Sequence, residues 1–162
     1  EYINFLIHEL LSMISCLSGH TSDGGKMLFS WKERKALQKL ELDIIETLFP
    51  DGDYQHFAQY AEMVCSFFVS DAFKEKDYEK LWYWLDRGAD FANYADTYNP
   101  DSVHTSPILR GYSSGGWIME ESGNRSQAIL EWLTSDNEIE VLRSDSRYEP
   151  LVARLKQVAI KP

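Results

Sequence analysis

The sequence predicts an all-α protein in which antiparallel helix pairs stack as a short α-solenoid, closed at the C-terminal end by a cap of short helices. Three observations support this prediction. Apolar residues recur with the spacing of a one-faced helix over four long stretches. The 162 residues include five prolines, and 44% are hydrophobic, which is enough to fill the core of one domain. Short connections between long helices make neighbouring helices antiparallel.

The first helix pair is expected over residues 2–17 and 31–48. A Ser/Gly-rich loop separates the two helices, and Ser30 with Glu33 forms the capping-box pattern that opens the second. Pro50 ends that helix. The residues expected to face inward are Ile3, Leu6, Ile7, Leu10, Ile14 and Leu17 in the first helix, and Leu37, Leu40, Ile44 and Leu48 in the second.

The second helix pair is expected over residues 55–73 and 78–95, so that residues 1–96 hold two long pairs. A short turn is expected at 74–76, with Asp77 as the following N-cap. Three consecutive rings, at 82–84, cannot all face one core, because adjacent helical positions differ by about 100°. At least one ring is therefore expected on a surface. The expected inward residues are Phe57, Tyr60, Ala61, Val64, Phe68 and Ala72, and then Leu81, Leu85, Gly88, Ala89 and Ala92.

Residues 97–125 are expected to form a long irregular connection, because prolines and glycines interrupt the helical pattern there. Short capping helices are expected over 126–160. Capping-box patterns at 124–127 and 135–138 should open helices near 129–133 and 139–142. Ser146 should cap a last helix that has Pro150 in its first turn, where proline is tolerated.

The formal net charge is −10 and the sequence pI is about 4.8. Such a surface repels phosphate backbones and disfavours anionic membranes, so direct contact with nucleic acid or membrane is not expected. No stretch is expected to supply the roughly 18 apolar residues that span a bilayer. Cys16 and Cys65 lie in apolar helical contexts, and we expect free, buried thiols in a reducing cytoplasm.

The sequence predicts no catalytic, cofactor or metal site. Residues 111–115 match Gly-x-Ser-x-Gly, but that nucleophile elbow needs a preceding strand and a later histidine, and the last histidine is His104. The stretch 51–53 begins like a calcium loop but lacks its remaining ligands. We therefore expect a non-enzymatic protein, and a hydrolase using Ser113 is the weakest alternative.

Residues 61–95 resemble a tetratricopeptide (TPR) unit. The stretch 76–80, Lys-Asp-Tyr-Glu-Lys, is similar to the Gly-Asp-Tyr-x-x-Ala turn between the two helices of that repeat. The match departs from the repeat at Asn93, where the family has proline. The resemblance implies a TPR-like solenoid in which the first helix of each pair lines the concave side. The residues that it places there, as a possible groove for a partner, are Met63, Ser66, Ser70, Phe73 and Lys74.

Five segments, taken in order, resemble the C-terminal region of Xre-class helix-turn-helix transcriptional regulators of Firmicutes. They are residues 32–36, 48–54, 77–80, 104–109 and 142–148. In that family an N-terminal helix-turn-helix binds DNA and a TPR-like domain follows. The resemblance implies that a DNA-binding domain precedes Glu1 and is missing from this chain. It also implies that the chain senses an effector, forms dimers or binds a partner.

Two functions are therefore expected. The first is a cytoplasmic regulatory domain that binds a peptide, a small effector or a protein partner, with homodimerisation, and that reaches DNA only through the absent domain. The alternative is a helical-repeat scaffold for protein–protein interaction, with no link to transcription. The residues encoded before Glu1 would distinguish them.

Overall fold

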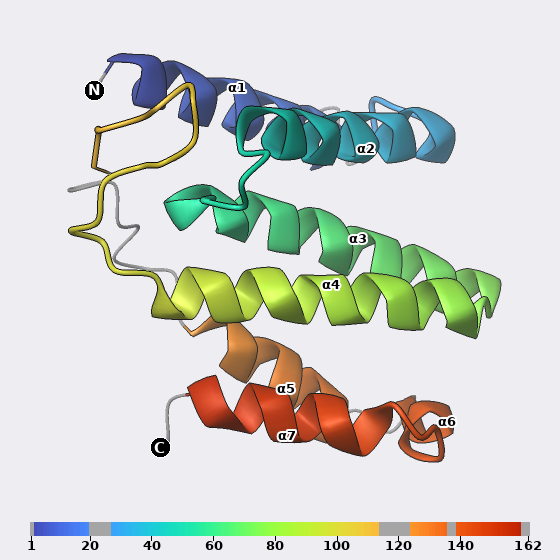
Figure 1. Ribbon diagram of the computed structural model, residues 1–162. Helices are drawn as coiled ribbons and strands as arrows, with labels where there is room; N and C mark the ends of the chain where they lie inside the picture. The colour runs from blue at the N-terminus through green and yellow to red at the C-terminus, as the bar shows by residue number, and fades with distance from the viewer. Residues whose placement is uncertain (1, 20–26, 114–123, 136–138, 160–162) are drawn as a thin grey trace.

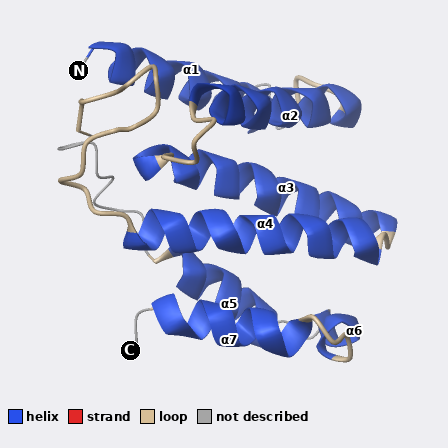
Figure 2. Ribbon diagram, in the orientation of Figure 1, coloured by secondary structure: helices blue, strands red, loops and turns tan. Residues whose placement is uncertain are grey.

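The computed structural model describes residues 2–19, 27–113, 124–135 and 139–159. Helices account for most of these residues, and the described ranges contain an isolated bridge between Val103 and Ser113 but no strand (Figure 2). The elements in order are α1 (Tyr2–Gly19), α2 (Trp31–Leu48), the 3-10 turn η1 (Gln55–Phe57), α3 (Ala58–Glu75), α4 (Tyr78–Thr97), α5 (Arg125–Ser135), α6 (Glu140–Arg143) and α7 (Tyr148–Val158). The all-α prediction is confirmed.

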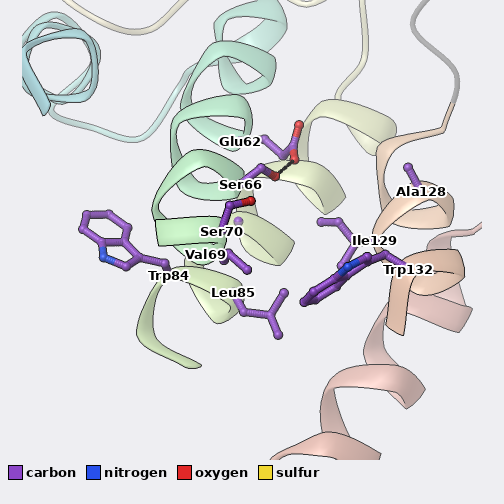
Figure 3. A pocket seen from close by; sticks show the side chains of 10 residues that line it. Glu62, Ser66, Val69, Ser70, Trp84, Leu85, Ala128, Ile129 and Trp132 are labelled. Atoms are coloured by element: carbon purple, nitrogen blue, oxygen red, sulfur yellow. Dashed lines mark hydrogen bonds between the residues drawn. The ribbon is translucent and has the colours of Figure 1, made fainter. Parts of the chain in front are cut away.

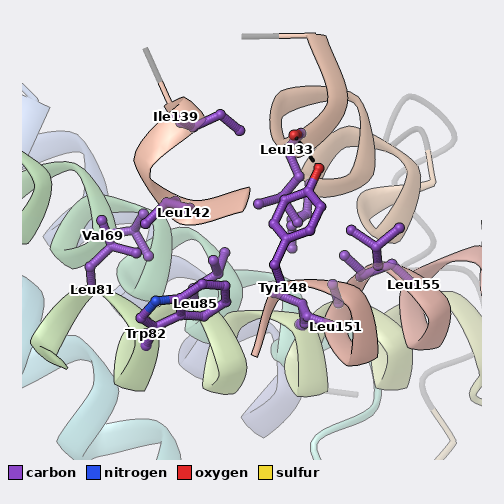
Figure 4. Packing of buried hydrophobic residues seen from close by; sticks show 14 of the residues in the cluster. Val69, Leu81, Trp82, Leu85, Leu133, Ile139, Leu142, Tyr148, Leu151 and Leu155 are labelled. Carbon is purple, nitrogen blue, oxygen red and sulfur yellow. Dashed lines mark hydrogen bonds between the residues drawn. The ribbon is translucent and has the colours of Figure 1, made fainter. Parts of the chain in front are cut away.

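The helices pack as pairs, α1 with α2, α3 with α4 and α5 with α7 (Figure 1). The α3/α4 pair lies in the middle of the stack. It therefore contributes to two hydrophobic clusters, one shared with α1, α2 and η1 and the other shared with α5, α6 and α7. Figure 4 shows the second cluster, in which Leu81 of α4 lies beside Val69 of α3 and near Leu142 of α6. Burial of both faces explains the broad apolar band of the α3/α4 stretch.

Helix ends are set by the local chemistry that the sequence indicates. Ser30 and Glu33 form the expected capping box at the start of α2, and Asp77 accepts a hydrogen bond from the amide of Lys80 at the start of α4. Lys76 has a left-handed conformation, with φ of 57°, and its amide and that of Asp77 bond back to carbonyls of the last turn of α3. This is a Schellman ending, at the position where a TPR turn has glycine.

The inward faces predicted for α1 and α2 are correct only in part: Ile7 and Ile14 are buried, and Ile44 and Leu48 pack against the core. Most of the residues predicted for α1 are exposed, and its buried residues are Asn4, Ile7, Leu11, Ile14 and Ser18. In α2, Leu40 is exposed and the buried residues are Gln38, Glu41, Leu42 and Ile45. The physical reason is polar pairing between the two helices. Glu41 accepts a hydrogen bond from the Ser15 hydroxyl at 2.6 Å, and Gln38 donates to Ser18. Buried polar groups need such partners.

Several local predictions are also corrected. Helix α3 continues through Glu75, so the turn is confined to Lys76. Helix α5 begins at Arg125, directly after the predicted cap Asn124. The last helix has Arg147, not Ser146, as its N-cap, because Asp145 accepts the hydrogen bond from the Arg147 amide. The capping box predicted at 135–138 lies on residues outside the described ranges. Cys16 is exposed, whereas Cys65 is buried and burial raises its pKa to about 12.

Helix α1 is the one helix in the described ranges that is long and apolar enough to cross a membrane, judged by length and composition alone. A core helix of a soluble protein or a signal sequence passes the same test, so the result is weak evidence. Helix α1 therefore does not meet the expectation that no stretch is long and apolar enough to span a bilayer. The expectation of a cytoplasmic protein stays a prediction.

Candidate functional site: a groove between α3 and α5

A groove of about 240 Å³ lies between α3 and α5, with α4 beneath it (Figure 3). Glu62, Ser66 and Ser70 of α3 give it a polar wall. Ile129 and Trp132 of α5 give it an apolar wall. Val69, Leu85, Gly88, Ala128 and Trp84 complete the lining, although the Trp84 ring points away from the other side chains in Figure 3. A mostly apolar hollow with a few convergent polar groups is the usual form of a ligand site.

The N-terminus of α5 is attached to the end of α4 by side-chain hydrogen bonds. Both oxygens of the Asp96 carboxylate accept from α5 amides, those of Arg125 at 3.0 Å and Ser126 at 2.8 Å. The Ser126 hydroxyl donates to the Asn93 side chain at 2.8 Å. Asn124 adds a cap by accepting from the amide of Gln127. A helix N-terminus is a favourable place for a carboxylate, so these contacts attach the start of α5 to the end of α4.

One end of the groove is closed by an ion pair between the two walls. The guanidinium of Arg125 lies 2.5 Å from the Glu62 carboxylate, and both side chains are largely buried. Arg125 also donates to Gln59 at 3.3 Å, and Glu62 accepts from the Ser66 hydroxyl at 2.7 Å. Since its charges are paired, this end of the groove presents hydrogen-bonding groups without a net charge.

The floor of the groove depends on a glycine. A Cβ atom added at Gly88 would lie 3.2 Å from the Cβ of Cys65, so the lack of a side chain lets α3 and α4 approach closely. A larger residue at position 88 would both separate these helices and fill the groove. This is a structural role for a small residue that the sequence pattern already placed on the inner face.

The structure brings together two of the five residues predicted for a partner groove. Ser66 and Ser70 line it. Met63 is exposed on the same helix without lining the groove, and Phe73 is partly buried against the α5–α7 cluster. The ammonium of Lys74 lies 5.0 Å from the Trp31 ring, on the side of α2.

The other wall of the groove was missed by sequence reasoning. Ile129 and Trp132 come from α5, some 60 positions beyond Ser66 and Ser70 in the sequence. No local pattern connects them to α3. The only signal within the sequence was the spacing of Ala128 and Trp132, which places both on one helical face.

A second hollow, of about 650 Å³, lies between α4 and α7, but its charged groups are already paired. Arg147 contacts Glu79 and Asp145, and Arg154 contacts Asp86 and Asp90. These ion pairs join the acidic residues of α4 to the segment 145–154. Arg87 pairs with Glu46 of α2. The arginines of this surface therefore serve to join helices, and the α3–α5 groove is the stronger candidate.

No family model, curated protein or solved structure matches this chain. The argument for function therefore rests on geometry. Ser113, the residue of the rejected nucleophile elbow, is paired with Val103 in the isolated bridge, in irregular chain. Among the described residues, no group of three or more His, Cys, Asp or Glu side chains is placed to hold a metal ion.

Proposed function

We propose that this chain is a regulatory domain whose α3–α5 groove binds a peptide or a small effector through an apolar side chain. The observation that carries the proposal is the groove itself. Trp132 and Ile129 offer an apolar surface, and Ser66 and Ser70 face them with hydroxyl groups. A volume of about 240 Å³ suits one large side chain of a ligand better than a whole drug-sized molecule.

The TPR resemblance supports the choice of this groove, because that repeat lines its concave side with the first helix of each pair, and α3 and α5 are the first helices of their pairs. The resemblance to Xre-class regulators supplies the rest of the proposal. In such a protein the DNA would be contacted by a helix-turn-helix encoded before Glu1, and this acidic domain would report ligand binding to it. An acidic surface suits that division of labour, because it does not itself attract DNA.

The alternative is a scaffold that binds a protein segment in the same groove without any link to transcription. The two proposals agree on the groove and differ in the domain that accompanies it. Reading the residues encoded before Glu1 distinguishes them, since only the regulator requires a helix-turn-helix there.

The groove is tested with thermal unfolding of the 162-residue chain in the presence of short apolar and aromatic peptides and small metabolites. A compound that binds the folded state but not the unfolded chain raises the melting temperature, and the shift grows with the logarithm of its free concentration above Kd. Ser70→Trp should fill the groove and abolish the shift. The matched control is Met63→Trp, on an exposed position of the same helix outside the groove, and it should leave the shift intact. A shift that survives Ser70→Trp would overturn the proposal, and so would a panel without any hit.

A further inference from the structure

Helix α1 presents an apolar face to the outside of the stack. Along it, the exposed fractions of five large apolar side chains lie between 37% and 55%; these residues are Ile3, Leu6, Leu10, Met13 and Leu17. Tyr2 and Phe5 lie beside them and are exposed as well. Single exposed apolar residues are ordinary, whereas a continuous row of them marks an interaction surface.

The five residues follow a strict 3, 4, 3, 4 spacing, which is the a/d spacing of a coiled-coil seam. The buried residues of α1 follow the same spacing one position later, from Asn4 to Ser18. Helix α1 therefore has two seams about 100° apart. One seam is covered by α2, and the other is exposed.

The outward seam cannot simply exchange places with the inward one. The inward seam is fixed to α2 by polar contacts that are specific to it. Arg34 donates to the carbonyl of Ser18 at 2.5 Å, and Ser15 donates to Glu41. Rotating α1 would leave the buried Glu41 side chain without that donor, which is unfavourable.

The near absence of charge on α1 allows a second, equally acidic copy of the chain to approach at this face. The chain carries a net charge of −10, yet α1 contains no Lys, Arg or Asp and a single Glu, Glu9. A basic partner would be attracted to the acidic remainder of the surface, and an anionic membrane would be repelled by it. Two copies of the chain repel each other least where both are uncharged, and that place is the α1 seam.

The exposed apolar area of α1 is large enough for a contact between two copies. A large apolar side chain offers about 200 Å², so the exposed parts of the seam and of Tyr2 and Phe5 leave on the order of 600 Å² per copy. Two such faces together would bury at most roughly 1,200 Å², which reaches the lower limit of a specific interface.

We propose that the outward face of α1 is the contact between two copies of this chain, formed by α1 packing against α1 of the partner through the seam Ile3, Leu6, Leu10, Met13 and Leu17. The groove lies on other elements of the stack, so this inference does not depend on the ligand-binding proposal. It assigns a place to the self-association that the sequence resemblance implies.

The test is the mass of the 162-residue chain in solution, measured by sedimentation equilibrium over a broad concentration range. The wild-type chain should reach twice 18.8 kDa, and Leu10→Glu and Met13→Glu should each give 18.8 kDa at the same concentration. Because the contact is apolar between like-charged chains, added salt should strengthen the dimer. The matched control is Val141→Glu, an equally exposed apolar residue on α6 at the opposite end of the stack, which should remain dimeric.

Circular dichroism shows whether each variant keeps its helix content, which is expected because the substituted side chains are exposed. A wild-type chain that stays monomeric at every concentration would overturn the proposal. So would a dimer that survives both α1 substitutions, a dimer that salt dissociates, or a monomer that floats with phosphatidylcholine vesicles through α1.

Discussion

Asp51 and Thr105, which are 54 positions apart in the sequence, are joined by a 2.8 Å hydrogen bond from the Thr105 hydroxyl to the Asp51 carboxylate. The same carboxylate accepts from Ser106, and the neighbouring Asp53 accepts from the Thr105 amide at 2.6 Å. The turn after α2 therefore holds the irregular segment that follows α4. Two of the five segments that carry the resemblance to Xre-class regulators, 48–54 and 104–109, meet at this contact.

Asp51→Asn should loosen that segment. The amide that replaces one carboxylate oxygen cannot accept a hydrogen bond, so Thr105 or Ser106 loses its partner. The Ser106 hydrogen bond lowers the pKa of Asp51, so acidification below its ordinary range should have the same effect. Hydrogen exchange measures the result, and the amides of residues 103–112 should exchange faster while those of α3 stay protected.

The matched control for Asp51→Asn is Asp101→Asn, the same change of side chain on an exposed residue of the same irregular segment. It should leave the exchange unchanged. If both variants accelerate amide exchange equally, the negative charge of this region, and not the contact with Thr105, holds the segment.

Glu41→Gln should stabilise the protein at neutral and alkaline pH. Burial raises the pKa of Glu41 from 4.5 to about 7, although the Ser15 hydrogen bond lowers it. The folded state therefore holds more protons than the unfolded chain between pH 4.5 and 7, and the free energy of unfolding falls as pH rises through this window. Above pH 7 the free energy of unfolding has fallen by about 3 kcal/mol relative to its value below pH 4.5. Glutamine keeps an acceptor for Ser15 without the charge, so denaturant unfolding at pH 8 should show the gain, and unfolding at pH 4.5 should not.

His56→Gln should reduce the acid sensitivity of the fold. Burial, together with the nearby His104 and His8, lowers the pKa of His56 from 6.5 to about 3. The unfolded chain then holds the extra proton, so stability is complete above pH 6.5 and is lost as pH falls, by up to about 1.4 kcal/mol per pH unit. The slope of stability against pH below 6.5 is the measurement. An unchanged slope in His56→Gln would assign the acid sensitivity to other groups.

The last two predictions are linked, because Glu41 and His56 act in opposite directions between pH 4.5 and 6.5. Their effects on the free energy of unfolding partly cancel in the wild-type chain. On acidification from pH 6.5 to 4.5, Glu41→Gln should therefore lose stability more steeply than the wild type, and His56→Gln should gain stability.

Features that depend on neighbours in the sequence could be predicted. The Ser30 capping box, the Asp77 cap and the exposed ring at Tyr83 follow from local spacing, and the structure has all three. The inner face of α3 also followed from its periodicity. Each of these features depends on residues within one or two turns of a helix.

Features that depend on a partner helix could not be predicted. Helix α1 is apolar almost all round, so its pattern does not say which seam faces α2. Asn4 and Ser18 are buried there, at positions where a search for apolar residues does not look. The groove is a similar case, because Ser66 and Ser70 were identified from the α3 turn, whereas Trp132 reaches them through the attachment of α5 to Asp96.

The final prediction concerns the ion pair between Glu62 and Arg125, which joins α3 to α5. Arg125→Met removes the charge but keeps most of the stem, and it leaves the Glu62 carboxylate, 10% exposed, without its cation. Glu62→Gln leaves Arg125 without its anion. Removing one partner of a buried pair costs about 3 kcal/mol or more, since the remaining charge is desolvated and unpaired. The double variant has no unpaired charge, so it should be destabilised by less than the sum of the single variants, with a coupling of about 1–3 kcal/mol. Denaturant unfolding of the wild type, the two single variants and the double variant measures this coupling. Strict additivity would mean that the pair is solvated in solution and that Asp96 and Asn93 alone fix the position of α5.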